Sequence, residues 1–261
     1  MNLPNKIQNI IDNKSYACDN VGKSGAGVYL FEDMVLKIQT VDAQAENEVK
    51  MLHWLNGKIP VPEIIEHIYE NEYLYILMNK CTGKMACDSY FMMRPKQQME
   101  LLAEAMHRLW NVPIEGCPCH ISLKKRLKMA EKNIINNRVD LENVELNTFG
   151  PNGFKNPEAL LYWLYDNKPN EKETVCHGDF CLPNIFLSDS GVTGMIDLGR
   201  SGVADPWLDI ALCCRSLDHN YNGVYDGNSY KGFEQQMLFD ALEIQPDPEL
   251  IRYYILLDEL F

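Results

Sequence analysis

The chain has 261 residues, of which 46% are hydrophobic and 23% charged, and its formal net charge is −13. The length is enough for one large domain or two lobes, and the acidic excess argues against nucleic acid as a partner, because its phosphates must be neutralised by Lys and Arg. With no run of about 18 apolar residues and no signal-peptide core after Met1, we expect no membrane span and a cytoplasmic location.

Nine cysteines are present. An odd number in a chain of this length indicates packed thiols rather than a disulfide framework. The segment Cys117-Pro-Cys119-His120 lacks the second ligand pair of a zinc site, so no zinc is expected. Nothing in the sequence indicates an obligate protein partner.

The first 80 residues are rich in strand patterns. The expected elements are a helix over 4–12, strands over 28–31 and 34–38, a helix over 43–56, and strands over 62–69 and 73–79. Before the first strand lies a Gly-rich turn, residues 21–27, which includes Ser24. Glycines there would let backbone N–H groups approach phosphate oxygens, although most such turns are only hairpins.

Lys37 lies inside an apolar strand, an unusual place for an unpaired ammonium group. One interpretation is an edge-strand lysine that points to solvent. The next helix favours another, because Glu48 borders its apolar stripe and can face inward to pair with Lys37. In kinases such a Lys–Glu pair fixes the lysine that binds the nucleotide phosphates.

The rest of the chain is mainly helical, with helices expected over 95–111, 122–137, 157–166, 206–217, 230–241 and 247–260. A polar stretch predicts a hinge at 81–85, between an N-terminal lobe (1–80) and a C-terminal lobe (86–261). Main-chain groups of such a hinge can bind a nucleotide base. The sequence therefore predicts an α+β fold of two lobes, with a ligand site in the cleft between them.

The segment 176–200 carries polar residues in a fixed order: His177, Gly178, Asp179, Asn184 and Asp197. A hairpin with strands over 185–187 and 192–196 joins the last two of them. The spacing matches the protein-kinase pattern H-R-D-x-x-x-x-N followed by D-F-G, with Gly178 for Arg and Leu198 for Phe. Single residues of this kind are common in surface turns, but the whole constellation favours phosphoryl transfer.

Phosphoryl transfer needs oxygen ligands for Mg²⁺ and a carboxylate that orients the attacking hydroxyl. Asn184 and Asp197 supply such oxygens, and Asp179 suits the role of base. The helix after the N-cap Asp205 carries Asp209 in its first turn. That carboxylate could brace the catalytic loop or merely complement the helix dipole.

Acidic residues gather in two further places. The loop 140–145 could recognise a polyamine or could be a solvated connection. The chain ends with Asp258-Glu259-Leu260-Phe261, and the apolar residues before this tail indicate a packed helix that holds the acidic group in place.

Four stretches carry a resemblance to a known family: WLNGKIPVP (54–62), His177-Gly178-Asp179 with Asn184, IDLGRSG (196–202) and YYILLDELF (253–261). From about Val21 to Phe261 the chain resembles the aminoglycoside phosphotransferases, in their 3′-phosphotransferase branch. The resemblance implies a protein-kinase-like fold. It also implies transfer of the γ-phosphoryl group of ATP or GTP to a hydroxyl of an aminoglycoside, the 3′-hydroxyl, which confers antibiotic resistance.

The resemblance also implies roles for individual residues. Asp179 would be the base, Asn184 and Asp197 would hold Mg²⁺, and Lys37, paired with Glu48, would bind the phosphates. Ser24 matches a residue over the phosphates, and Lys80 and Cys81 match main-chain contacts to the base. The positions that match aminoglycoside contacts are Glu142, Asn143, Glu145, Arg200, Asp258, Glu259 and the carboxylate of Phe261.

Some positions depart from the family pattern. Val35 replaces an aromatic residue of some relatives, so weaker purine stacking is expected. Leu182 and the pair His219-Asn220 replace acidic residues of the antibiotic site. Two alternatives stay open: a kinase for another small hydroxylated or cationic metabolite, and a catalytically silent nucleotide-binding protein, against which the intact kinase residues argue.

Overall fold

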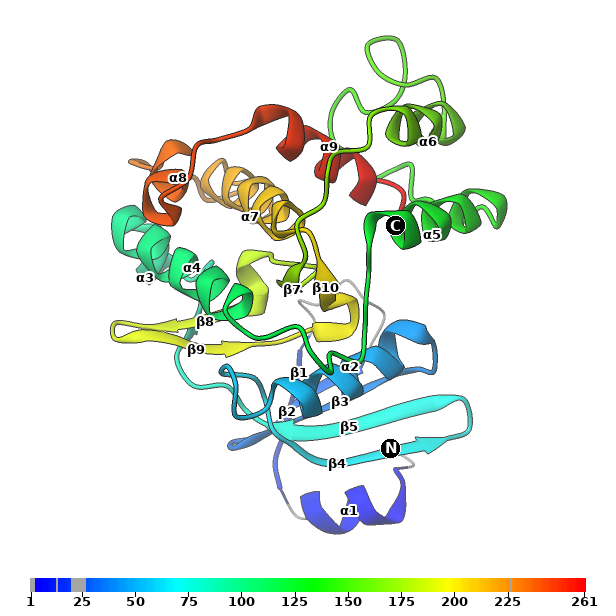
Figure 1. The fold of residues 1–261 in the computed structure, drawn as a ribbon. Helices are drawn as coiled ribbons and strands as arrows, with labels where there is room; N and C mark the ends of the chain where they lie inside the picture. The colour runs from blue at the N-terminus through cyan, green and yellow to red at the C-terminus, as the bar shows by residue number, and fades with distance from the viewer. Residues whose placement is uncertain (1–2, 13, 20–26, 226) are drawn as a thin grey trace.

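The computed structural model describes residues 3–12, 14–19, 27–225 and 227–261. In the N-terminal lobe an antiparallel sheet has the strand order β1-β2-β3-β5-β4 (Figure 1). Its strands are β1 (Ala17–Asp19), β2 (Gly27–Leu30), β3 (Met34–Thr40), β4 (Ile64–Glu70) and β5 (Tyr73–Asn79). Apart from the short β1, these are the strands expected from the sequence.

Helices cover both faces of this sheet, α1 (Asn5–Ile11) on one and α2 (Ala43–Leu55) on the other (Figure 1). Strand β5 packs against both of them, because successive side chains of a strand point to opposite faces. Ile76 belongs to the core with Val49 of α2, whereas Leu77 belongs to the core with Ile7 of α1. This two-sided burial accounts for the continuous apolar sequence of β5.

The C-terminal lobe is mainly helical and also contains two small sheets. Its helices are α3 (Ser89–Met92), α4 (Pro95–Trp110), α5 (Leu123–Ile135), α6 (Pro157–Asp166), α7 (Pro206–Tyr221), α8 (Gln236–Leu242) and α9 (Pro248–Asp258). Its strands are β6 (Lys84–Met85), β7 (Thr174–Cys176), β8 (Ile185–Ser188), β9 (Gly191–Met195) and β10 (Gly202–Ala204). The fold is the expected α+β arrangement of two lobes. Within the described ranges, no helix has both the length and the apolar character needed to cross a membrane.

Of the two small sheets, only the hairpin of β8 and β9 was expected from the sequence. β7 pairs with β10, and β6 pairs with β8. The segment 201–207 was expected to be only a turn, and 81–85 only a hinge. β10 is buried and is a strand because it pairs with β7, whose last residue lies 26 positions before the first residue of β10. A pairing between segments so far apart leaves no local sequence pattern.

The helix expected over 230–241 is also shorter, because α8 begins at Gln236. The preceding residues are bound to the end of α7 instead. Tyr230 N–H donates to the Tyr221 carbonyl at 2.9 Å, and the rings of Tyr221 and Phe233 stack with centroids 4.4 Å apart. The same packing explains why α7 continues to Tyr221, beyond the expected end at residue 217.

Candidate active site

Lys37 and Glu48 meet between β3 and α2. Both Glu48 oxygens lie 2.9 Å from Lys37 Nζ, and Gln39 Nε2 lies 2.8 Å from Glu48 Oε2. Lys37 is 7% exposed and Glu48 2%. The pairing expected from the stripe of α2 is therefore confirmed, and the solvent-facing alternative for Lys37 is wrong.

Asp197 joins this pair from the C-terminal lobe. It lies two residues beyond β9, with a left-handed backbone (φ +64°), and its Oδ1 is 2.5 Å from Lys37 Nζ. Burial lowers the pKa of Lys37, but the charges of Glu48 and Asp197 outweigh burial and hold that pKa above its ordinary value. Because the Asp197 side chain is 41% exposed, it can also offer oxygen to a further group.

The loop after β7 is braced from α7. Asp209 Oδ2 accepts the N–H of His177 at 2.7 Å, and Oδ1 accepts the N–H of Gly178 at 2.8 Å. Burial raises the pKa of Asp209 to about 7, although these two amide donors act to lower it. The bracing role expected for Asp209 is confirmed, and Asp205 caps α7 by accepting Trp207 N–H at 2.9 Å.

Asp179 is held at both of its oxygens. Asn184 Nδ2 lies 3.0 Å from Oδ2, and Cys181 Sγ lies 3.1 Å from Oδ1. His177, whose pKa is lowered by burial, accepts the N–H of Asp179 at Nδ1 (3.3 Å). Burial and then the charge of Asp179 raise the pKa of the Cys181 thiol well above its ordinary value.

The residues near Asp179 fit a divalent cation such as Mg²⁺. Across the described chain no group of three or more His, Cys, Asp or Glu gathers as a metal site. Mg²⁺ needs no such group, since it is held by one or two carboxylates with waters and substrate phosphates. Asn184 directs its amide nitrogen to Asp179, which leaves its Oδ1 for a cation. The main chain brings Asn184 close to Asp197, because Ile196 N–H donates to the Asn184 carbonyl at 3.0 Å.

An arginine cluster, which consists of Arg126, Arg200 and Arg215, surrounds the carboxylate of Asp258. Arg200 and Arg215 bind separate oxygens of Asp258, the latter at 2.5 Å, and Arg126 lies at 3.5 Å. Burial acts to raise the pKa of Asp258, but the three guanidinium groups hold it far below its ordinary value. Burial and the neighbouring Arg200 lower the pKa of Arg126 to about 10.

Glu259 and Glu145 extend this network toward the surface. Arg215 Nη1 lies 3.1 Å from Glu259 Oε1, and Glu259 Oε2 accepts the N–H of Glu145 at 2.8 Å. The Glu145 carboxylate faces His219 Nε2 at 3.1 Å. Burial raises the pKa of Glu259 to about 7. The structure thus joins the acidic loop to the end of α9, which the sequence left as two separate segments.

The other expected acceptor residues lie in two places, an exposed turn and the C-terminus. Glu142 and Asn143 are exposed in a turn closed by Asp140, which accepts the N–H of Glu142 at 2.9 Å. The Phe261 ring lies under two guanidinium groups, at 4.7 Å from Arg126 Cζ and 5.4 Å from Arg200 Cζ. The packed tail expected at the C-terminus is confirmed, since Leu260 is fully buried.

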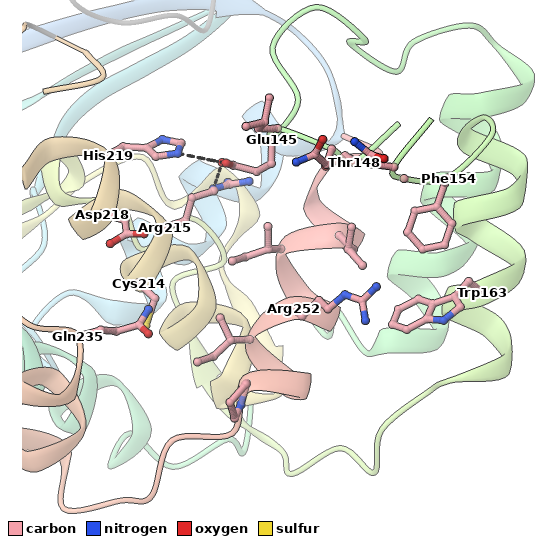
Figure 2. A pocket seen from close by; sticks show the side chains of 18 of the residues that line it. Glu145, Thr148, Phe154, Trp163, Cys214, Arg215, Asp218, His219, Gln235 and Arg252 are labelled. Carbon is pink, nitrogen blue, oxygen red and sulfur yellow. Dashed lines mark hydrogen bonds and ion pairs between the residues drawn. The ribbon is translucent and has the colours of Figure 1, made fainter. Parts of the chain in front are cut away.

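A cavity of about 660 Å³ continues outward from Glu145. Figure 2 shows Arg215 and His219 directed at Glu145 at one end, and Phe154 beside Trp163 at the other. The side chains of α9 lie between the two ends. The cavity therefore adjoins the acidic loop and not the Lys37 side of Asp179.

The hinge residues are placed only in part. Lys80 N–H donates to the Asp33 carbonyl at 3.0 Å, so this amide is already used. Cys81 is half-buried and packs against Gly194 of β9, and burial raises the pKa of its thiol to about 11. Ser24 and the rest of the Gly-rich turn lie outside the described residues.

Sequence reasoning missed two residues of the arginine cluster, Arg126 and Arg215. The Lys-rich sequence of α5 suggested a solvated face, yet Arg126 is 4% exposed beside Leu127 and Leu123. Its position next to that apolar stripe was the available signal. Arg215 carried no comparable signal, because its partners Asp258 and Glu259 lie at the C-terminal end of α9, more than 40 residues later.

Comparisons with known proteins agree with this geometry. The profile of the Phosphotransferase enzyme family matches residues 21–242. Aminoglycoside 3′-phosphotransferases from Enterococcus faecalis and Staphylococcus aureus are 36% and 35% identical, over all of this chain and 99% of each relative.

Among solved structures, the aminoglycoside 3′-phosphotransferase of type VIII superposes with a TM-score of 0.82 at 26% identity, covering 98% of this chain and 97% of that one. An aminoglycoside phosphotransferase from Streptomyces rimosus gives 0.80 at 26% identity, covering 97% and 95%. With a full-length match in sequence and in fold, this chain belongs to the phosphotransferase enzyme family, in its aminoglycoside 3′-phosphotransferase branch.

Proposed function

We propose that this protein transfers the γ-phosphoryl group of ATP or GTP to the 3′-hydroxyl of an aminoglycoside and so confers resistance. The observation that carries the proposal is the convergence of Lys37, Glu48 and Asp197 from the two lobes. An ammonium group fixed by two carboxylates beside a braced Asp179 loop is the arrangement that phosphoryl transfer requires.

On the nucleotide side, Lys37 would bind the phosphates and Glu48 would hold it in place. Asn184 and Asp197 would hold Mg²⁺, which when bound neutralises charge on the phosphates. Residues 81–85 would be the hinge between the lobes (1–80 and 86–261), where the carbonyl of Lys80 and the main chain of Cys81 would contact the base. Ser24 would lie over the phosphates.

On the acceptor side, Asp179 would orient the sugar hydroxyl and accept its proton. The ammonium groups of an aminoglycoside would bind carboxylates in charge-assisted hydrogen bonds. Glu145, which is part-exposed, suits this better than Asp258, whose carboxylate is already shared by three guanidinium groups. Glu259 belongs to the proposed set as the carboxylate that holds Arg215 and the N–H of Glu145. Glu142, Asn143, Arg200 and the carboxylate of Phe261 complete the proposed acceptor set.

The direct test is ADP release by the purified protein with kanamycin B and with tobramycin, which lacks the 3′-hydroxyl. We expect turnover with kanamycin B and loss of turnover with tobramycin. The same assay with a panel of hydroxylated and cationic metabolites tests the alternative, a kinase for another small metabolite. Equal rates with both antibiotics would overturn the 3′ assignment, and activity only with a metabolite would overturn the aminoglycoside.

The proposed base has its own test. Asp179→Ala should lower kcat at least about 100-fold, because general base catalysis contributes on that order. ATP affinity should change far less than kcat, since among the proposed nucleotide-side residues Asp179 contacts only Asn184 and neither Lys37 nor Glu48 within the described interactions. Turnover and nucleotide titrations on the same preparation check both points, and near-normal turnover would defeat the mechanism.

A further inference from the structure

Cys181 has no role in the mechanism above, yet it touches the proposed base. It lies two residues after Asp179, just before the 3-10 turn η1 (Leu182–Asn184). Its Sγ is 3.1 Å from Asp179 Oδ1, while Asn184 Nδ2 is 3.0 Å from Oδ2. A thiol and an amide thus hold the two oxygens of one carboxylate.

The direction of this hydrogen bond follows from the groups themselves. An ionised carboxylate has no hydrogen to give, so the Cys181 S–H is the donor and Asp179 Oδ1 the acceptor. A bond to a charged acceptor is stronger than one between neutral groups. The contact can therefore restrict rotation of the Asp179 side chain, even though a thiol is a weak donor.

The main chain fixes the sulfur in place. Cys181 N–H donates to the Asp179 carbonyl at 2.8 Å, and Asn184 N–H donates to the Cys181 carbonyl at 2.9 Å. The cysteine side chain has only one rotatable bond between this closed turn and its sulfur. The thiol is therefore preorganised toward Asp179 before any acceptor binds.

The thiol also lies near the arginine cluster. Arg215 and Asp258, both from the arginine cluster, are near enough to Cys181 to influence the pKa of its thiol. Cys181 is half-buried rather than sealed in the core. The thiol therefore contacts the group that would take the acceptor proton and lies near the arginine cluster.

We propose that Cys181 is a positioning residue for phosphoryl transfer, whose thiol fixes one oxygen of Asp179 and so orients this carboxylate toward the acceptor hydroxyl. The inference rests on the proposed role of Asp179. The thiol keeps its proton throughout: the acceptor proton passes to Asp179, and the acceptor oxygen forms the new bond to phosphorus as the nucleoside diphosphate leaves.

The kinetic test compares Cys181→Ala with Cys181→Ser. The Ala variant loses the donor, and kcat with kanamycin B should fall about three- to ten-fold, since misplaced catalytic groups lower turnover. KM for ATP and the thermal midpoint should hardly change, which a general structural role would not allow. The Ser variant keeps a donor and should restore most of the wild-type kcat. Cys119→Ala, which removes a half-buried thiol elsewhere, is the matched control.

A spectroscopic test does not depend on turnover. The infrared difference between wild type and Cys181→Ala isolates the S–H stretch of this one thiol. In an Asp179→Asn background the band should move to higher frequency, because a neutral amide is a weaker acceptor than a carboxylate. If the wild-type protein phosphorylated no aminoglycoside but the band still shifted, the proposed substrate would be wrong while the Cys181–Asp179 contact would be supported. An unmoved band, a Cys181→Ala enzyme with wild-type kcat, or a Ser variant no better than Ala would each overturn the inference.

Discussion

Gly178 separates the two polar residues His177 and Asp179 and adopts a backbone conformation with φ of +82°. A Cβ at this position would meet the carbonyl of Arg200. Arginine, which protein kinases place between His and Asp, would suffer both the strain and the collision here. Glycine thus lets the catalytic loop lie directly against the turn that follows Asp197.

This argument predicts a difference between two glycines with similar backbones. Gly57 has φ of +76° but nothing within 4 Å of a built Cβ. Gly57→Ala should cost about 1 kcal/mol of unfolding free energy, from backbone strain alone. Gly178→Ala adds the collision and should cost about 3 kcal/mol and lower kcat. Denaturant unfolding and turnover of both variants check this, and equal losses would contradict the role of Arg200.

Asp209 gives a pH-dependent prediction. Burial raises its pKa to about 7, so between pH 4 and 7 the folded state keeps a proton that the unfolded state has released. The stability from this group is complete below pH 4 and is lost as pH rises through 7. Asp209→Asn should remove a slope of about −1.4 kcal/mol per pH unit in that window.

The measurement is the unfolding free energy of both proteins from pH 4 to 8. Asp209→Asn should also be less stable overall, because an amide offers one acceptor oxygen where two N–H groups need one each. Asp240→Asn, an exposed carboxylate on α8, serves as the control. Parallel pH curves for wild type and Asp209→Asn would show that burial does not shift this group.

Helix α2 connects the two lobes through a side chain that the sequence did not single out. Asn47 Nδ2 donates to the carbonyls of Gly199 (3.0 Å) and Ser201 (2.8 Å), in the segment after Asp197. Glu48, the next residue, holds Lys37. Adjacent residues of one helix therefore place the two partners of the Lys37–Asp197 contact.

Asn47→Ala should leave two carbonyls without their donor and destabilise the protein by about 1 to 3 kcal/mol. KM for ATP should rise, because Asp197 loses its fixed position relative to Lys37. Thermal unfolding and steady-state kinetics measure these effects, with the exposed Gln44→Ala on the same helix as control. If KM for ATP matched wild type, α2 would not set the position of Asp197.

The elements that the sequence predicted well are those whose pattern is local. The stripe of α2 placed Glu48 toward Lys37, and the position of Asp209 in the first turn of its helix predicted that it braces the loop before Asp179. The misses depend on partners far apart in the chain: β10 needs β7, and Arg215 needs α9. Such contacts are decided by three-dimensional packing and cannot be predicted from the individual segment.

At the scale of the whole molecule, the two lobes supply different halves of the proposed chemistry. The N-terminal sheet and α2 hold a fixed cation, Lys37, whereas the C-terminal lobe presents carboxylates at Asp179 and Glu145. An anionic phosphate chain would therefore bind beside the N-terminal lobe and a polycationic acceptor beside the C-terminal lobe. The net charge of −13 favours the approach of the cation over the whole surface.

This charge predicts how turnover depends on salt. Raising ionic strength from about 10 mM to about 150 mM shortens the Debye length from about 30 to about 8 Å. Because the long-range attraction is then screened, kcat/KM for a polycationic acceptor should fall about ten-fold, while kcat changes little. The same series for ATP, an anion, is the internal control, and its kcat/KM should not fall in parallel. Equal decreases for both substrates would point to a general salt effect on the enzyme rather than to attraction of the acceptor.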